Sequence, residues 1–414
     1  MRCKNSDIRK GLTIKAIARC AALFLFCLLP LKGICQTGEE VVDALVEMGF
    51  ENVGWTEDGN ERVYVLENSA YRIQGVGIGK AIDVIQKNGL AEGKSCRVIV
   101  LDNNVPQISL CYHPLKSDTT EVVEHEDWKV SYDLGGAWKK ARKVKGKNSS
   151  LFKVDVLVYP QLYFKNYIIT QIYQVCLEFS PAVEVSLWKG SKLTAQVIFP
   201  VYNDGYRGEM ENIRWGYLTL EQSVRLPHDV WVKAVAGVFD TRCYGLELSA
   251  FHPMKDERFS LAGKFGIVGE GCFTNMNRFQ YSGRTQWYWS VGGDFYWPKY
   301  NTAFRLRAEQ YLLKDVGVRA EMTRYFKYAA ISFYLCESNK ARYNGGFRIS
   351  VALPPYKYKR KGYIPRVSTG FGTGITYNAG NERIYYKMPF VTADENILKR
   401  NQYNPYFIKT EIVN

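Results

Sequence analysis

The stretch CYGLELSAF at residues 243–251 decides the fold, because apolar and polar side chains alternate along it. The same alternation recurs at residues 259–267, 287–295, 316–323 and 347–353. A period of two residues is typical of a β-strand with one apolar and one polar face. Runs of about ten residues with aromatic side chains at their ends are typical of membrane-spanning barrels, in which lipid contacts the apolar face and the lumen contains the polar one.

Comparable runs follow one another from residue 129 to residue 378. They predict a mainly β fold, an antiparallel outer-membrane β-barrel of about 12–16 strands. Residues 379–414 are predicted to be a C-terminal tail or the last strand. The chain ends in Val413 and Asn414 rather than in the aromatic residue that often closes such barrels.

The first 35 residues have the pattern of a signal peptide. A segment with six basic residues precedes an apolar run at 21–31, which is too short to cross a membrane as a helix. Ile34 stands before Cys35, where a lipoprotein signal requires a small residue, so lipidation is the lesser alternative; a buried N-terminal helix is another. Removal of residues 1–35 would lower the net charge from +14 to about +8.

Residues 36–112 are predicted to form a small α+β domain in the periplasm, followed by a polar linker at 113–128. Helical spacing over 41–48 ends at Gly49, and a second helix is expected at 79–87. A strand at 62–67 and a hairpin of 96–101 with 106–111 complete the domain. The hairpin turn is expected at Asn103 and Asn104, because Asn tolerates the positive φ of a tight turn.

The hairpin makes a disulfide between Cys96 and Cys111 a candidate. A two-residue turn at Asn103 and Asn104 would place the two cysteines opposite each other, at about 5.5 Å between Cα atoms. The oxidising periplasm permits the bond. Two free thiols on neighbouring strands are the alternative, since a slip of one residue would separate the cysteines onto opposite faces.

No motif for catalysis, a metal or a cofactor survives inspection, and we predict a protein that is not an enzyme. Gln74 and Ala81 stand where a phosphate-binding loop needs Gly and Ser or Thr, so the glycines of 75–79 are expected in a tight strand-to-helix turn. Basic runs at 139–147 and 357–361 suit an anionic surface, a polysaccharide or solvated loops. Export argues against a nucleic-acid partner.

The polar strand faces supply the candidate site residues. Basic, acidic and aromatic side chains are expected to point into the lumen, where tyrosines stack on sugar rings and arginines bind hydroxyl or acidic groups. An internal lattice of salt bridges that fills the barrel is the alternative. The candidate residues are Lys264, Arg305, Arg307, Arg319, Arg348, Glu247, Asp294, Glu309, Glu321, Tyr288 and Tyr296.

The same region resembles a known family. The segments 237–239, 244–247, 259–271, 309–317 and 345–354, together with a turn at 323–326, are similar to the YjbH-domain family, best over about residues 230–355. The resemblance implies an outer-membrane protein of exopolysaccharide or capsule production, which takes part in assembly, export or surface retention. Its expected partners are outer-membrane lipid, an anionic or neutral polysaccharide and periplasmic proteins of the exopolysaccharide machinery.

Two other classes of protein stay open at this point. A soluble β-sandwich that binds polysaccharide would bury one apolar face of each sheet instead of exposing a continuous apolar band. A polysaccharide-degrading enzyme would bring two carboxylates together in a groove. Exposure or burial of the apolar strand faces therefore distinguishes a membrane barrel from a soluble sandwich. The placement of the carboxylates distinguishes a barrel without catalytic activity from a degrading enzyme.

Overall fold

The computed structural model describes residues 38–114, 123–166, 173–239, 242–340, 342–369, 373–379, 388–389, 391–392 and 403–413. The predicted signal peptide, 1–35, lies outside the described residues, as does 115–122 of the predicted linker. Residues 38–414 form one compact unit that contains two sheets. Among the described residues, no helix has both the length and the apolar character that crossing a membrane requires.

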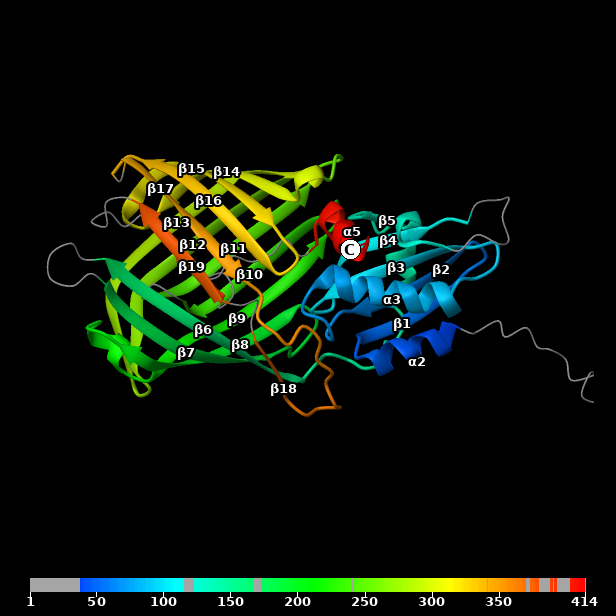
Figure 1. The fold of residues 1–414 in the computed structure, drawn as a ribbon, viewed down its shortest axis with the longest axis horizontal. Coiled ribbons are helices and arrows are strands. Elements are labelled where there is room, and N and C mark those ends of the chain that lie inside the picture. Colours follow the sequence, from blue (N-terminus) through cyan, green and yellow to red (C-terminus); the bar gives the residue numbers. More distant parts are fainter. Residues whose placement is uncertain are drawn as a thin grey trace, which may run out of the picture. The chain divides into compact units, whose positions relative to one another are not determined.

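The first sheet has five strands in the order β1-β2-β3-β4-β5 (Figure 1). Strands β2 and β3 are parallel and are connected through helix α3, whereas the other neighbours are antiparallel. The elements of this domain are α2 (Gly38–Met48), β1 (Glu51–Glu57), β2 (Glu61–Glu67), α3 (Gln74–Asn88), β3 (Ser95–Asp102), β4 (Val105–Tyr112), η1 (His125–Asp127), β5 (Lys129–Ser131) and α4 (Ala137–Ala141).

The small domain has an apolar core on each face of its sheet. On one face, Leu45 of α2 and Ile82 of α3 pack with Tyr64 of β2, and all three are fully buried. On the other face, Ala137 of α4 packs against Ile99 of β3 and its neighbours. Full burial of a leucine or isoleucine side chain is worth about 1.5–3 kcal/mol, so these two cores make the domain an ordinary water-soluble fold.

The structure confirms the two helices of this domain and its hairpin turn, but it moves the end of the domain. Asn103 and Asn104 have φ values of 50° and 64°, as a tight turn requires. Strand β5, predicted as the first strand of the barrel, pairs with β4 in the small sheet. A strand of three residues carries too little alternation to show which sheet it joins.

The structure shows the alternative to the Cys96–Cys111 disulfide, two free thiols, because a bulge in the hairpin shifts the register. Gln107 has no partner in the ladder, and beyond it the register shifts by one residue. Cys96 therefore faces Tyr112, and Cys111 faces Arg97, which places the cysteines on opposite faces of the sheet. Both are buried free thiols, and burial raises the pKa of each thiol.

The second sheet has 14 strands, within the predicted range, and neighbours from β6 to β17 are antiparallel. In hydrogen-bonded order the described sheet is open, with β18 at one end, parallel to β6, and β19 at the other, antiparallel to β17 (Figure 1). Its strands are β6 (Val154–Asn166), β7 (Tyr173–Val185), β8 (Ser191–Asn203), β9 (Arg214–Leu226), β10 (Val230–Val238), β11 (Cys243–Pro253), β12 (Phe259–Asn275), β13 (Arg278–Trp297), β14 (Thr302–Tyr311), β15 (Asp315–Tyr325), β16 (Ala329–Ser338), β17 (Arg342–Val351), β18 (Arg366–Thr369) and β19 (Thr373–Ala379). Short helical turns η2 (Gly208–Glu211), η3 (Pro298–Tyr300) and η4 (Leu312–Lys314) lie between strands.

The large sheet exposes apolar side chains on one face and buries polar side chains on the other. Leu306 of β14 is 59 % exposed and Leu335 of β16 is 71 % exposed, whereas Glu247 of β11 is 1 % exposed. The other exposed apolar side chains include Phe179, Leu220, Leu248, Phe265, Trp287, Val318 and Phe333. Buried polar side chains include Glu178, Gln196, Thr219, Ser290, Thr323, Ser332 and Ser350. This polarity is the reverse of that in a water-soluble fold.

The C-terminal region contains helix α5 (Pro405–Val413), so the expected tail is partly helical. The helix packs on α3 through glycines: a Cβ added at Gly75 would lie 2.2 Å from the Cβ of Glu411. The Gly75 amide donates to the Glu411 carboxylate at 3.0 Å. The glycines of 75–79 therefore lie inside α3 and allow close helix packing; the predicted strand-to-helix turn is wrong.

Candidate functional site

A cluster of charged side chains lies on the inner face of β13, β14 and β15. Asp294, Arg305 and Glu321 stand in one cross-strand row, because Arg305 pairs with Asp294 on one side and with Glu321 on the other. Arg307 pairs with Arg319 in the next row of the same face. Alternation along the strands thus brings together the charged residues that the sequence predicts to point inward.

The cluster is held by alternating ion pairs. The Asp294 carboxylate is 2.5 Å from Arg307 and 4.0 Å from Arg305. The Glu321 carboxylate is 3.1 Å from Arg305 and 3.3 Å from Arg319. Each arginine therefore faces at least one carboxylate, as the salt-bridge lattice predicts.

The cluster also remains open to small molecules. Its side chains keep between 14 % and 32 % of their surface exposed, so the inner face is not packed solid at this level. The guanidinium of Arg319 lies 4.1 Å from the ring centre of Tyr334, and Arg305 donates to the Tyr325 hydroxyl at 3.4 Å. Arg348 of β17 projects from the same face, opposite Ser332. Paired but accessible cations beside aromatic rings are suited to bind hydroxyl-rich or acidic ligands.

A second inner cluster joins the remaining predicted residues. The Tyr288 hydroxyl donates to the Glu247 carboxylate at 2.7 Å, and Lys264 lies 3.4 Å from the same carboxylate. Glu309 accepts from the Ser290 hydroxyl at 3.4 Å. Glu309 also interacts electrostatically with Arg319 of the first cluster, so the two groups adjoin each other, and Tyr296 belongs to neither.

Neither predicted stacking tyrosine is available to a sugar ring. Tyr288 is fully buried and belongs to an apolar cluster that includes Val391, a residue that follows the last strand. Tyr296 is 2 % exposed and packs against Phe407 of α5, with ring centres 6.4 Å apart. Residues of the C-terminal region thus lie against the inner face of the sheet at two places.

Phe407 is the functional residue that sequence reasoning missed most clearly. Its ring is 1 % exposed, lies 5.2 Å from that of Tyr325, and fills an apolar gap between Ala303 and Ala330. Asn404 accepts hydrogen bonds from the amides of residues 406 and 407 and so caps the helix. The pair Asn404–Pro405 is the sequence signal for this helix start.

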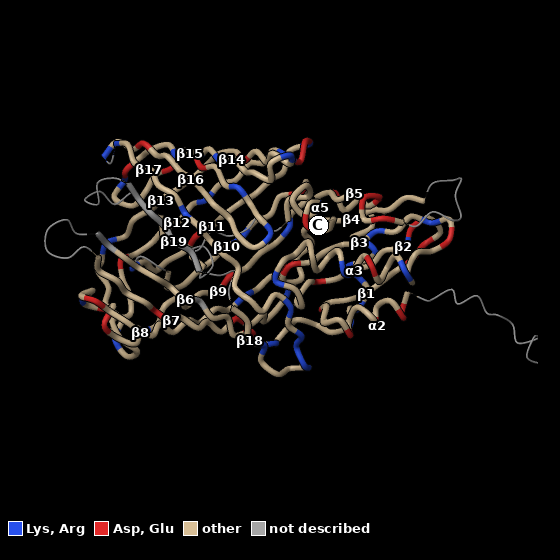
Figure 2. The backbone as a smooth tube through the Cα atoms, in the orientation of Figure 1, with Lys and Arg blue, Asp and Glu red and all other residues tan. Residues whose placement is uncertain are grey.

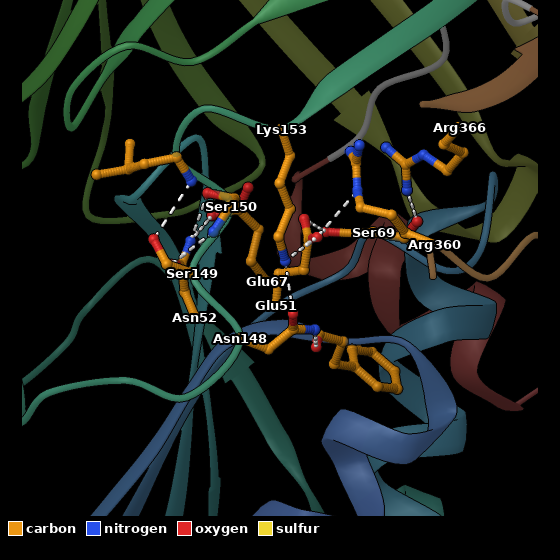
Figure 3. Close-up of polar contacts among 12 residues, drawn as sticks. Glu51, Asn52, Glu67, Ser69, Asn148, Ser149, Ser150, Lys153, Arg360 and Arg366 are labelled. Carbon is orange, nitrogen blue, oxygen red and sulfur yellow. Dashed lines mark hydrogen bonds and ion pairs between the residues drawn. The ribbon is translucent and has the colours of Figure 1, made fainter. Parts of the chain in front are cut away.

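Figure 3 shows a buried ionic junction between β1, the entry to β6 and the segment before β18. The Glu51 carboxylate is 2.9 Å from Lys153 and 3.1 Å from Arg360, and all three side chains are at most 5 % exposed. Asp155 of β6 pairs with Arg360 at 2.5 Å and with Arg366 of β18 at 2.6 Å. These charges connect the small domain to both β6 and β18.

A buried acid with a raised pKa lies beside this ionic junction. Asn52 donates to the Glu67 carboxylate at 2.7 Å, and the Asn104 amide donates at 2.9 Å. Burial, together with the nearby acidic groups Asp102 and Glu51, raises the pKa of Glu67 to about 7. Glu67, at the end of β2, therefore changes charge near neutral pH.

The two basic runs have different surroundings. Lysines of 139–147 lie on the surface, where Lys140 pairs with Asp58 at 2.5 Å and Lys147 pairs with Asp43 at 2.8 Å. In the run 357–361, which leads toward β18 (Figure 2), Arg360 is buried in the ionic junction and Lys357 lies over the Tyr71 ring at 5.1 Å. The expectation of a solvated loop is therefore wrong for Arg360.

Comparison with known proteins adds little. No family model and no curated protein matches the chain. A mutant of the Rh. blastica porin is similar with a TM-score of 0.27 and 8% identity over 49% of this chain and 90% of that chain. A loop-deletion mutant of OmpT, an outer membrane protein of Vibrio cholerae, has a TM-score of 0.24 and 9% identity over 48% of this chain and 85% of that chain. Scores of this size establish neither a shared fold nor a shared function.

The described residues place the chain in the class of mainly β proteins with one large antiparallel sheet of reversed polarity. Among the same residues, no group of three or more His, Cys, Asp or Glu side chains has the arrangement of a metal site.

Proposed function

We propose that this chain is an integral β-barrel of the outer membrane of a Gram-negative cell, with its N-terminal domain in the periplasm. The observation that carries the proposal is the reversed polarity of the large sheet, in which Leu306 and Leu335 are exposed and Glu247 is buried. In water, such a face would be an aggregation hazard. In lipid, it is the face that stabilises the protein.

The proposal includes closure of the sheet into a barrel. Strands β6 to β17 are twelve antiparallel neighbours, with β18 beside β6 and β19 beside β17. We take β18 and β19 together as the thirteenth position of the barrel, where they pair with both edges of the sheet. An odd number of alternating strands requires a parallel seam, and the β18–β6 pair is parallel. A closed sheet would leave no unpaired edge in lipid.

Cell fractionation together with gel mobility tests this placement. The protein is expected in the outer-membrane fraction, and its mobility on a denaturing gel should change after heating, because a lipid-embedded barrel resists detergent until heated. Recovery in the soluble periplasmic fraction would contradict the proposal.

We further propose that the barrel acts, without catalysis, in the assembly, export or surface retention of an exopolysaccharide or capsule. The YjbH-domain resemblance carries this part. The accessible arginine cluster around Arg305 and Arg319 supports it, since guanidinium groups bind carboxylates and hydroxyls of polysaccharides by charge-assisted hydrogen bonds.

The double substitution Arg305→Glu with Arg319→Glu tests the polysaccharide role. It should reduce surface polysaccharide while the amount of protein in the membrane stays unchanged. The pair Arg305→Lys with Arg319→Lys keeps the charge and serves as a control for the ion-pair lattice. Unchanged polysaccharide at a normal protein level would restrict these arginines to a structural role.

A further inference from the structure

A groove of about 930 Å³ lies on the exposed face of β12 to β17, and its lining is almost entirely apolar. The groove is formed by a cross-strand row in which large and small residues alternate. The leucines project from the sheet, and the glycines and the alanine between them leave space. The row consists of Leu261, Gly293, Leu306, Ala320, Leu335 and Gly345.

Aromatic side chains wall the groove toward one end of the strands. The next row of the same face contains Phe259, Phe295, Phe304, Met322 and Phe333. The ring centres of Phe259 and Phe295 are 4.8 Å apart, and those of Phe295 and Phe304 are 6.2 Å apart. Trp297, whose ring centre lies 6.4 Å from that of Phe304, and Tyr300 follow this row, and these two residue types are typical of the boundary between hydrocarbon and headgroups.

The turns beyond this aromatic row carry cations. Residues 297–302 and 324–329 contain three basic residues and no acidic one. Each basic side chain is exposed and lies over an aromatic ring: Lys299 over Tyr300 at 5.4 Å, Arg324 over Phe326 at 5.6 Å and Lys327 over Tyr328 at 6.0 Å. The Tyr325 amide donates to the Asn301 carbonyl at 2.9 Å, so the two turns are adjacent.

The cations stand close to the groove. Arg324 follows Met322 by two residues on the same face, a distance of about 7 Å along the strand. The same end of the sheet contacts the small domain, because Glu257, in the turn before β12, accepts hydrogen bonds from Ser131 at 2.6 Å and from the Tyr132 amide at 2.7 Å.

We propose that this groove binds an anionic phospholipid of the membrane leaflet on the side of the small domain. Its acyl chain would lie among the leucines and phenylalanines, and Lys299 and Arg324 would bind its phosphate. Charge complementarity favours this occupant, because the two cations attract a lipid with a net negative charge more strongly than a zwitterionic one. The turn 254–258 at the same end contains as many basic as acidic residues. The inference rests on the proposed membrane location.

Photo-crosslinking in vesicles tests the inference. The full-length protein is reconstituted into phosphatidylcholine vesicles that contain a photoactivatable phosphatidylglycerol or, in equal amount, a photoactivatable phosphatidylcholine. Crosslinked peptides are then mapped by mass spectrometry. The phosphatidylglycerol probe should label peptides that contain Gly293 and Leu306 more strongly than the phosphatidylcholine probe does.

Two variants separate the headgroup from the acyl-chain contact. Lys299→Gln with Arg324→Gln should reduce the excess of phosphatidylglycerol labelling by at least about fivefold, the effect of one basic residue near a membrane surface. Gly293→Leu should reduce labelling of the groove by both probes, and the site tolerates a side chain, since an added Cβ would meet nothing closer than 3.7 Å.

Matched controls lie at other places on the same strands. Gly283→Leu, where an added Cβ has no neighbour within 4 Å, and Lys314→Gln with Arg342→Gln, at the opposite ends of the strands, should leave groove labelling unchanged. Equal labelling by the two probes, or an unchanged excess in the variant that combines Lys299→Gln with Arg324→Gln, would overturn the inference. Flotation with the vesicles is scored first: a protein that does not float contradicts the proposed function as well, whereas one that floats without lipid preference contradicts the groove alone.

Discussion

In the small domain, β2 and β3 bury Tyr64 and Val98, whereas in the large sheet β14 and β16 expose Leu306 and Leu335 and bury Glu309. Strand β2 carries apolar side chains on both faces, since Tyr64 belongs to one core and Val63 to the other. The strands of the large sheet alternate between exposed apolar and buried polar side chains. The difference teaches that a sheet covered by helices on both faces needs apolar side chains on both, whereas the large sheet carries them on its exposed face alone.

The largest effect is expected at helix α5, where the apolar side chain of Phe407 packs against the inner, polar face of the large sheet. Phe407→Ala should cost about 3–5 kcal/mol of stability, the usual range for a buried phenylalanine, and should loosen the helix from Tyr296 and Tyr325. Ion conductance across a planar bilayer should rise with it. Tyr406→Ala is the matched control, since Tyr406 is 37 % exposed on the same helix; equal effects of the two substitutions would refute the role of Phe407.

The junction offers a second test, because it is the place where the two regions share charges. Glu51→Gln leaves Lys153 buried without its carboxylate and leaves Arg360 with Asp155 alone, and it should destabilise the protein by about 3–5 kcal/mol, as removal of one partner of a buried pair does. Thermal unfolding of the purified protein measures the change. Glu47→Gln, at an exposed position on α2, should have little effect, and a junction variant as stable as this control would show that the ion pairs do not hold the domain.

A charge on the apolar face tests the comparison directly. Leu306→Arg should cost about 2–4 kcal/mol if the residue lies at the centre of a bilayer. Exposed to water, the same change would stay within about 0.5 kcal/mol. Val144→Arg, at a site in the small domain that is 37 % exposed, is the water-exposed reference. The amount of folded protein in the membrane gives the measurement, and equal yields would argue against lipid contact at Leu306.

The smallest effect is a pH dependence of the small domain. The pKa of Glu67 rises from 4.5 to about 7 on folding, so its protonated form favours the folded state. This contribution to the free energy of unfolding is complete below about pH 4.5 and is lost as the pH rises through about 7. Its magnitude is about 1–3 kcal/mol, because the side chain is partly exposed. Glu67→Gln should remove this part of the pH dependence, and parallel stability profiles of wild type and variant would contradict it.

The faces of the strands could be predicted from sequence, whereas contacts between distant segments could not. Arg305 and Glu321 alternate with apolar neighbours, so their shared face follows from the two-residue period alone. The bulge at Gln107 displaced the cysteines because no residue pattern there distinguishes a bulge from a regular ladder. Phe407 was missed because its partners, Tyr296 and Tyr325, are about a hundred residues away in the sequence.

The orientation of the large sheet in the membrane can be measured residue by residue. Single spin labels along β14, from Phe304 to Ala308, report collision with oxygen, which concentrates in lipid, and with a water-soluble nickel complex. Labels at 304, 306 and 308 should collide with oxygen, and labels at 305 and 307 with the nickel complex, in strict alternation. Equal exposure of all five positions to the nickel complex would contradict a lipid-facing apolar surface.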